Sequence, residues 1–126
     1  MANKKLLVVD DERDFVDIIA ERLGAKGFTI LKAYDGREGL EKALLEKPDL
    51  IVLDIAMPEM NGYDVCIKLK ENKDLKDTPV IILTAKFQPN DIEFGREVGA
   101  DAYLTKPLEL DTLLNKVNEL LKAKNK

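Results

Sequence analysis

The chain has 126 residues, the size of one ordinary domain, and its 45% apolar and 35% charged residues are typical of a compact soluble protein. A single cysteine and no histidine exclude an internal disulfide, a histidine-based catalytic triad and an ordinary structural zinc site. Because 24 acidic residues outnumber 20 basic ones, a nucleic-acid partner is disfavoured, and no apolar run approaches the roughly 20 residues of a membrane span.

Short apolar runs alternate along the chain with longer stretches of helical spacing, a pattern that predicts buried parallel strands joined by crossover helices. In the first half we expect a strand at 6–9, a helix closed by Gly27, a strand at 29–33 and a helix between Asp35 and Pro48. In the second half we expect a strand at 50–53, a helix capped by Gly62, a strand at 80–83, a helix at 92–98, a strand at 102–104 and a helix at 108–121.

The second predicted helix carries clear local signals. Asp35 can cap its first turn, and the carboxylate of Glu38 can reach back toward the preceding backbone. We expect Leu40, Ala43 and Leu44 to form its buried face, because residues spaced three and four apart lie on one side of a helix.

Five strand–helix units with right-handed crossovers predict a doubly wound α/β fold, a flavodoxin-like three-layer sandwich around a parallel five-stranded sheet. We expect the strand order 2-1-3-4-5. The apolar pattern ends shortly before the last residue, so we expect residues 1–126 to form one domain with no linker to a second one. The N-terminal residues lack the pattern of a signal peptide, which predicts a cytoplasmic location.

Polar side chains follow four of the predicted strands. Asp10 and Asp11 follow the first strand, Asp54 the third, Thr84 the fourth and Lys106 the fifth. Open parallel sheets bind their ligands at the carboxyl ends of the strands, where the winding direction reverses. In the expected order these four strands are consecutive, so the sequence predicts one cleft that holds three carboxylates, a hydroxyl and an ammonium group.

Three carboxylates at short range would raise one another's pKa values unless a cation joined them. Oxygen ligands favour Mg²⁺, with Mn²⁺ as an alternative, and the segment after Asp54 lacks the closely spaced oxygens of a calcium loop. A metal beside Lys106 predicts a site for a phosphoryl group, with Thr84 as a hydroxyl donor. Because neither a P-loop nor a histidine base occurs, Asp54 remains as the nucleophile that would attack phosphorus.

Four segments of the sequence carry a resemblance to a known family: LVVDDE at 7–12, LDIAMPEMNG at 53–62, LTA at 83–85 and GADAYLTKP at 99–107. Over essentially the whole chain they resemble the receiver domain of bacterial two-component response regulators, in its stand-alone, chemotaxis-regulator-like form. The resemblance implies that the chain accepts a phosphoryl group from a sensor histidine kinase or a phosphotransfer protein. It also implies a downstream protein target that recognises the phosphorylated form.

The resemblance assigns roles to individual residues of the cleft. It implies that Asp54 is the phosphoacceptor and that Asp10 and Asp11 bind Mg²⁺ together with Asp54 and the backbone carbonyl of Ala56. It implies that Lys106 pairs with the phosphoryl group.

Three further expectations follow from the same resemblance. The peptide bond between Lys106 and Pro107 is expected to be cis, and Thr84 and Tyr103 are expected to form a coupled switch. We expect this switch to change a partner-binding surface between the last two helices, around Phe94, Glu97 and Leu110.

Two other functions stay open at this point. A Mg²⁺-dependent phosphohydrolase would also use Asp54 as a covalent nucleophile, but such enzymes usually carry a second Asp two residues on, where this chain has Ala56. A constitutive adaptor with a vestigial site conflicts with the intact set of polar residues at the strand ends. The favoured interpretation is a signalling protein that catalyses its own phosphorylation and slow dephosphorylation.

Overall fold

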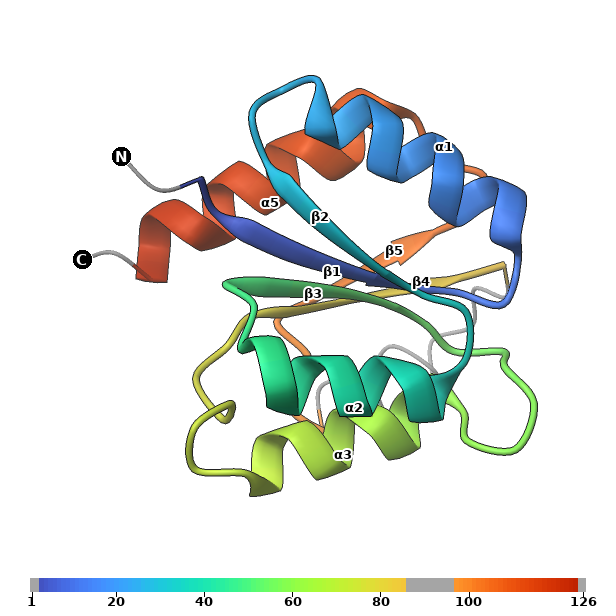
Figure 1. Ribbon diagram of the computed structural model, residues 1–126, viewed down its shortest axis with the longest axis vertical. Coiled ribbons are helices and arrows are strands. Elements are labelled where there is room, and N and C mark those ends of the chain that lie inside the picture. The colour runs from blue at the N-terminus through green and yellow to red at the C-terminus, as the bar shows by residue number, and fades with distance from the viewer. Residues whose placement is uncertain (1–2, 86–96, 125–126) are drawn as a thin grey trace.

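The computed structural model describes residues 3–85 and 97–124, and these form a three-layer sandwich around one parallel sheet (Figure 1). The five strands lie in the order β2-β1-β3-β4-β5, which confirms the predicted topology. Their bounds are β1 Lys5–Val9, β2 Thr29–Ala33, β3 Leu50–Asp54, β4 Val80–Thr84 and β5 Ala102–Thr105. Each expected strand is therefore present, and four of the five extend by one residue beyond the apolar run that predicted them.

Helices cover both faces of the sheet, with α1 and α5 on one side and α2 and α3 on the other (Figure 1). Their bounds are α1 Arg13–Gly24, α2 Gly36–Glu46, α3 Gly62–Glu71 and α5 Leu110–Lys124. Most of the helix expected at 92–98 lies outside the described residues. None of the helices within the described ranges is long and apolar enough to span a membrane.

The central strands β3 and β4 are buried along their whole length, as expected for strands covered on both faces. Alternate residues point to opposite faces and divide the core into two clusters. Leu7, Ile51 and Ile82 belong to the cluster under α2 and α3, whereas Leu6 and Val52 belong to the cluster under α1 and α5. The helices therefore hold the sheet in a fixed position, with its carboxyl edge available for a site.

The buried face of α2 differs from the sequence prediction. Gly36, Gly39 and Ala43 are buried, whereas Leu44 is 44% exposed and Leu40 is only partly buried. A side chain added at Gly39 would meet the Cγ atoms of Val9 at 2.8 Å. The helix therefore approaches β1 through its glycines, and the larger leucines are rotated toward the rim, which the apolar spacing alone could not reveal.

Two predicted helix ends also need correction. The cap of α3 is Asn61, whose side chain accepts a hydrogen bond of 3.0 Å from the amide of Asp64, and Gly62 is the first helical residue. Gly62 is needed for space, because a Cβ there would collide with the backbone carbonyl of Asp54. Helix α1 ends at Gly24, and Gly27, with φ of +100°, lies in the turn that follows.

The predicted cap of α2 is confirmed. The carboxylate of Asp35 accepts a hydrogen bond of 2.8 Å from the amide of Glu38. The Glu38 carboxylate reaches back and accepts one of 2.6 Å from the amide of Tyr34. The two carboxylates thus satisfy amide groups at the start of the helix that no helical carbonyl could reach.

The close approach of α2 to β1 leads to a stability prediction. Gly39→Ala should lower the free energy of unfolding by about 1 kcal/mol, because overpacking against the stiff Val9 side chain costs about 1–3 kcal/mol and outweighs a helix-propensity gain of about 1 kcal/mol. Gly24→Ala is the matched control, since nothing lies within 4 Å of a Cβ there, and it should be neutral or stabilising. Urea denaturation of both variants tests this, and equal effects would refute the packing argument.

Candidate functional site

The carboxyl edge of the sheet brings together the polar residues that the sequence singled out. Asp10 follows β1, Asp54 ends β3, Thr84 ends β4 and Lys106 follows β5. The strand register aligns Asp54 with Leu83 and Thr84 with Thr105, so these strand ends lie at the same level. The sheet topology therefore brings these polar residues together at one edge of the sheet, and we call this group of residues the acidic cleft.

Three carboxylates form the centre of this cleft. Ligand atoms of Asp10, Asp11 and Asp54 lie within 4.8 Å of one another. Asp10 and Asp54 are buried, whereas Asp11 is exposed and leaves the cluster open to water. An all-oxygen donor set with an accessible side fits a hard divalent cation such as Mg²⁺, which usually keeps several water ligands.

Burial and mutual repulsion set the ionisation of the two inner carboxylates. Loss of water raises the pKa of Asp10 above its usual value, although hydrogen bonds from Lys106 and the amide of Glu12 oppose the change. Loss of water, followed by the charge of Asp10, raises the pKa of Asp54 to about 6. Near neutral pH Asp54 is therefore largely ionised but held in an unfavourable environment, which a cation would relieve.

Lys106 is the internal cation of the cleft. Its Nζ atom lies 2.5 Å from a carboxylate oxygen of Asp10, 3.0 Å from one of Glu12 and 3.6 Å from one of Asp54. Burial by itself would lower the pKa of Lys106, but the hydrogen bonds to Asp10 and Glu12 outweigh it and raise the pKa. The ammonium group therefore stays charged, and it is bonded more closely to Asp10 and Glu12 than to Asp54.

Two contacts of Lys106 were not predicted from the sequence. Glu12 supplies a second carboxylate, and the ring of Phe15 lies beneath the ammonium group, with its centroid 4.5 Å from Nζ. Glu12 carries a signal in the sequence, because it directly continues the Asp10-Asp11 pair. Phe15 carries none beyond its place on an apolar helical face, since the contact depends on how the first turn of α1 lies beside the residue that follows β5.

Thr84 and Tyr103 lie on the same face of the sheet. Thr84 is buried and pairs in register with Thr105, two residues after Tyr103 on β5. The Tyr103 side chain packs against the core cluster under α2 and α3, and its hydroxyl is buried without a hydrogen-bond partner in the described part of the chain. The Tyr103 hydroxyl therefore already lies inside the protein.

The remaining predicted site residues lie beside the acidic cluster. Ala56 is exposed in the loop after Asp54, and its carbonyl accepts no hydrogen bond from a described backbone amide. The Lys106–Pro107 peptide bond is cis. The amide of Lys106 donates a hydrogen bond of 2.7 Å to the carbonyl of Thr84, which ties the ends of β4 and β5 together.

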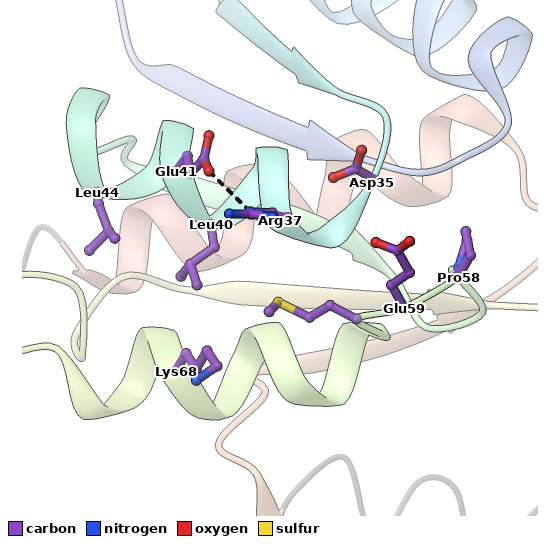
Figure 2. A pocket seen from close by; sticks show the side chains of 9 residues that line it. Asp35, Arg37, Leu40, Glu41, Leu44, Pro58, Glu59 and Lys68 are labelled. Carbon is purple, nitrogen blue, oxygen red and sulfur yellow. Dashed lines mark ion pairs between the residues drawn. The ribbon is translucent and has the colours of Figure 1, made fainter.

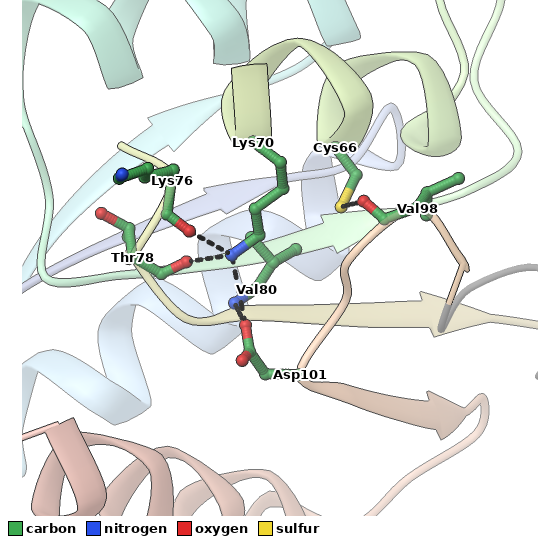
Figure 3. A network of polar contacts seen from close by, with 7 residues as sticks. All are labelled: Cys66, Lys70, Lys76, Thr78, Val80, Val98 and Asp101. Carbon is green, nitrogen blue, oxygen red and sulfur yellow. Dashed lines mark hydrogen bonds and ion pairs between the residues drawn. The ribbon is translucent and has the colours of Figure 1, made fainter. Parts of the chain in front are cut away.

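A polar network at the opposite end of the sheet positions the start of β5 (Figure 3). The Nζ atom of Lys70 donates hydrogen bonds to the carbonyls of Lys76 and Thr78, at 3.2 and 2.8 Å, and lies 3.4 Å from the carboxylate of Asp101. Asp101 also accepts a hydrogen bond of 2.8 Å from the amide of Val80. The network joins α3, β4 and the residue before β5, and thereby helps to place the strand that delivers Lys106.

Comparisons with known proteins give a consistent result for family and fold. The family model described as the response regulator receiver domain matches residues 6–118. The alkaline phosphatase synthesis transcriptional regulatory protein PhoP of Bacillus subtilis is 42% identical over 120 residues, which cover 95% of this chain and 49% of that protein. Response regulator MprA of Mycobacterium ulcerans is 38% identical over 118 residues, covering 94% and 50%. The chain thus spans about half the length of these curated relatives.

This chain matches several solved structures over nearly their whole length. Chemotaxis protein CheY4 of Vibrio cholerae superposes with a TM-score of 0.90 at 33% identity, over 94% of this chain and 99% of that chain. A CheY-like response regulator receiver domain protein of Methanospirillum hungatei superposes with a TM-score of 0.93 at 29% identity, over 98% of both chains. The sandwich is therefore the receiver fold over nearly its whole length.

The raised pKa of Asp54 predicts a pH-dependent gain in stability from its removal. With a folded-state pKa near 6 against 3.8 unfolded, the folded chain binds more protons between these values, so the contribution of this group to stability falls as pH rises through about 6. In metal-free buffer, Asp54→Asn should therefore raise the free energy of unfolding by about 1–3 kcal/mol at pH 7.5 and by almost nothing near pH 4.

Urea denaturation at the two pH values measures this difference. Glu71→Gln removes an exposed carboxyl outside the cleft and should not reproduce the gain at the higher pH. An Asp54→Asn effect that is the same at both pH values would contradict the electrostatic explanation.

Proposed function

The chain belongs to the response regulator receiver domain family, and we propose from this that it is a phosphorylation-activated switch with Asp54 as its phosphoryl acceptor. The observation that carries the proposal is the position of Asp54 at the end of the central strand, within the acidic cluster and 3.6 Å from the ammonium group of Lys106. A sensor histidine kinase or a phosphotransfer protein is the proposed donor.

The proposed reaction needs no general base. A carboxylate oxygen of Asp54 forms a bond to phosphorus while the bond from phosphorus to the donor's leaving atom breaks, and the leaving group keeps that electron pair. Burial raises the pKa of Asp54 to about 6, so the group is still largely ionised at neutral pH and needs no base to remove a proton. Lys106 would exchange a carboxylate partner for a phosphoryl oxygen, and the Thr84 hydroxyl would donate a hydrogen bond to another.

The residues present fit a Mg²⁺ ion, with Mn²⁺ as an alternative. Asp10, Asp11 and Asp54 would hold it with the carbonyl of Ala56. When bound, the ion would neutralise phosphoryl oxygens that three carboxylates otherwise repel.

The residue two positions after Asp54 favours a switch, which keeps its phosphoryl group, over a phosphohydrolase, which removes it. Ala56 supplies only a methyl group at the position where a second acid could position water, so the side chains near Asp54 do not form an obvious hydrolytic site. The phosphohydrolase alternative is therefore not favoured.

The absence of a nucleic-acid partner and a cytoplasmic location stay predictions.

The output of the switch is proposed to pass through Thr84 and Tyr103. Because these side chains share one face of adjacent strands, movement of Thr84 toward a phosphoryl group would change the space around the Tyr103 ring. The Tyr103 hydroxyl is buried in the unphosphorylated protein, so any movement of the ring on phosphorylation would start with the hydroxyl inside the protein. Of the expected partner surface, Glu97 and Leu110 are described, whereas Phe94 lies outside the described residues.

The assignment of Asp54 predicts a single phosphorylation event. Incubation with acetyl phosphate and Mg²⁺ should add one phosphoryl group to the wild-type chain, measured as intact mass. Asp54→Asn should abolish the gain, and removal of the metal by a chelator should slow it by at least about tenfold. Asp64→Asn, at an exposed acid in the first turn of α3, is the matched control and should be phosphorylated as wild type. A normal gain by Asp54→Asn would show that the acceptor is wrong.

The proposed switch predicts that Tyr103 responds to phosphorylation through the hydroxyl of Thr84. In Thr84→Ala, the phosphorylation-dependent chemical shift changes of Tyr103 should fall well below those of wild type, while Thr84→Ser should preserve them because it keeps the hydroxyl. A coupling of about 1–3 kcal/mol, or roughly 5- to 150-fold in partner affinity, is expected for such switches. Full Tyr103 shifts in a phosphorylated Thr84→Ala protein would rule out this route.

A further inference from the structure

Large apolar side chains are exposed on the two helices that cover one face of the sheet, α2 and α3. Among the described residues, four large apolar side chains are exposed: Ile18 by 51%, Leu44 by 44%, Leu45 by 79% and Ile67 by 39%. Two of these four, Leu44 on α2 and Ile67 on α3, line the space beside these helices, which pack side by side on one face of the sheet (Figure 1). An apolar cluster that remains exposed on a folded domain commonly marks an interaction surface.

Between these helices lies a groove, which we define by the residues of two adjoining hollows. The larger hollow, of about 630 Å³, lies between α2 and the loop that precedes α3 (Figure 2). The smaller one continues along α3 and shares Glu59, Met60 and Lys68 with the first. The apolar side chains that line the groove are Leu40, Leu44, Pro58, Met60 and Ile67. Figure 2 shows Leu40 and Leu44 pointing from α2 toward α3.

The charged side chains around this groove are predominantly acidic. Five acids line it against two bases: Asp35, Glu41, Glu59, Asp64 and Glu71 against Arg37 and Lys68. Arg37 is already paired with Glu41 at 3.5 Å, and the carboxylate of Asp35 caps α2.

Among the groove residues that form no ion pair, acids outnumber bases. Glu59, Asp64 and Glu71 are exposed and form no ion pair with any residue in the described ranges, and Lys68 is the unpaired base beside them. The groove therefore offers an apolar floor with a surplus of unpaired negative charge along one side.

We propose that this groove binds a short, basic amphipathic helix of a partner protein. The apolar face of such a helix would cover the floor, and its lysines or arginines would meet the unpaired carboxylates. Helix α2 has 11 residues and is about 16 Å long, so a partner helix of about three turns would run along the groove.

The charge of the groove favours this occupant over the alternatives. A second copy of the chain would bring the same acidic groove, or another surface of a chain with net charge −4, against unpaired carboxylates. Nucleic acid would be repelled for the same reason. A small ligand would leave most of the elongated apolar floor uncovered.

The groove is separate from the acidic cleft around Asp54, so the inference does not depend on the proposed function. None of the residues that line it belongs to the acidic cluster or contacts Lys106 within the described structure. Binding to the groove should therefore persist in Asp54→Asn, and a failure of either proposal leaves the other to be judged on its own experiment.

The test uses two synthetic peptides of about four helical turns with the same leucine face, one with lysine and the other with glutamate at all remaining positions. Binding to the isotope-labelled chain is measured by fluorescence anisotropy and by amide chemical shifts. The lysine peptide should bind at least about tenfold more tightly than the glutamate peptide and should weaken as salt is added. The largest shifts should occur at Leu40, Leu44, Met60 and Ile67.

Matched variants locate the binding surface. Leu44→Ala and Ile67→Ala should each weaken the lysine peptide by about fivefold or more, since apolar anchors at the centre of an interface carry most of its affinity. Leu45→Ala, at the next and more exposed residue of α2, does not line the groove and should stay within about twofold of wild type. Urea denaturation of each variant establishes that the fold is retained.

Any one of the following results would overturn the proposal. The first is equal affinity for the lysine and glutamate peptides. The second is an effect of Leu45→Ala as large as that of Leu44→Ala, or chemical shifts centred on the Asp54 cleft. The third is dimerisation of the chain in sedimentation equilibrium that Leu44→Ala abolishes, because the occupant would then be a second copy.

Discussion

The structure depends on one electrostatic constraint, the confinement of two buried carboxylates at the carboxyl edge of the sheet. Asp10 and Asp54 are held there by strands whose other residues are almost entirely buried, so neither can move out to water without disrupting the core. Lys106 makes this arrangement tolerable, because its ammonium group bonds to one carboxylate and lies close to the other. An unpaired buried charge would cost far more than such a pair.

This pairing joins residues that are 96 positions apart, and most of the fold serves to bring them together. The parallel strands align their carboxyl ends, and the hydrogen bond from the amide of Lys106 to Thr84 fixes the end of β5 against β4. At the other end of the same strand, Asp101 is held by Lys70 and by the amide of Val80. A strand of four residues is thus tied at both ends, which limits how far the ammonium group can move.

The sequence was sufficient for the strands, their order and the convergence of polar strand ends, because buried strands are continuous apolar runs and parallel strands align their ends. It was not sufficient for details that depend on how elements approach one another. Apolar periodicity predicted Leu44 in the core, but Leu44 is exposed. The periodicity could not show that α2 packs closely against β1 through its glycines, which turns Leu44 away from the core. The contact of Lys106 with Phe15 depends on where the first turn of α1 lies relative to the residues after β5, which no local pattern encodes.

The bond between Lys106 and Asp10 also has a consequence for any cation that enters the cleft. The ammonium group of Lys106, bonded to Asp10 and 3.6 Å from a carboxylate oxygen of Asp54, would compete for two of the three acids that could hold such a cation. A cation would have to displace the ammonium group or share these ligands with it, so it would bind more weakly than to three unpaired acids. If a cation binds there, this competition would lower its affinity, and after its loss the ammonium group of Lys106 would remain as the counter-charge of Asp10.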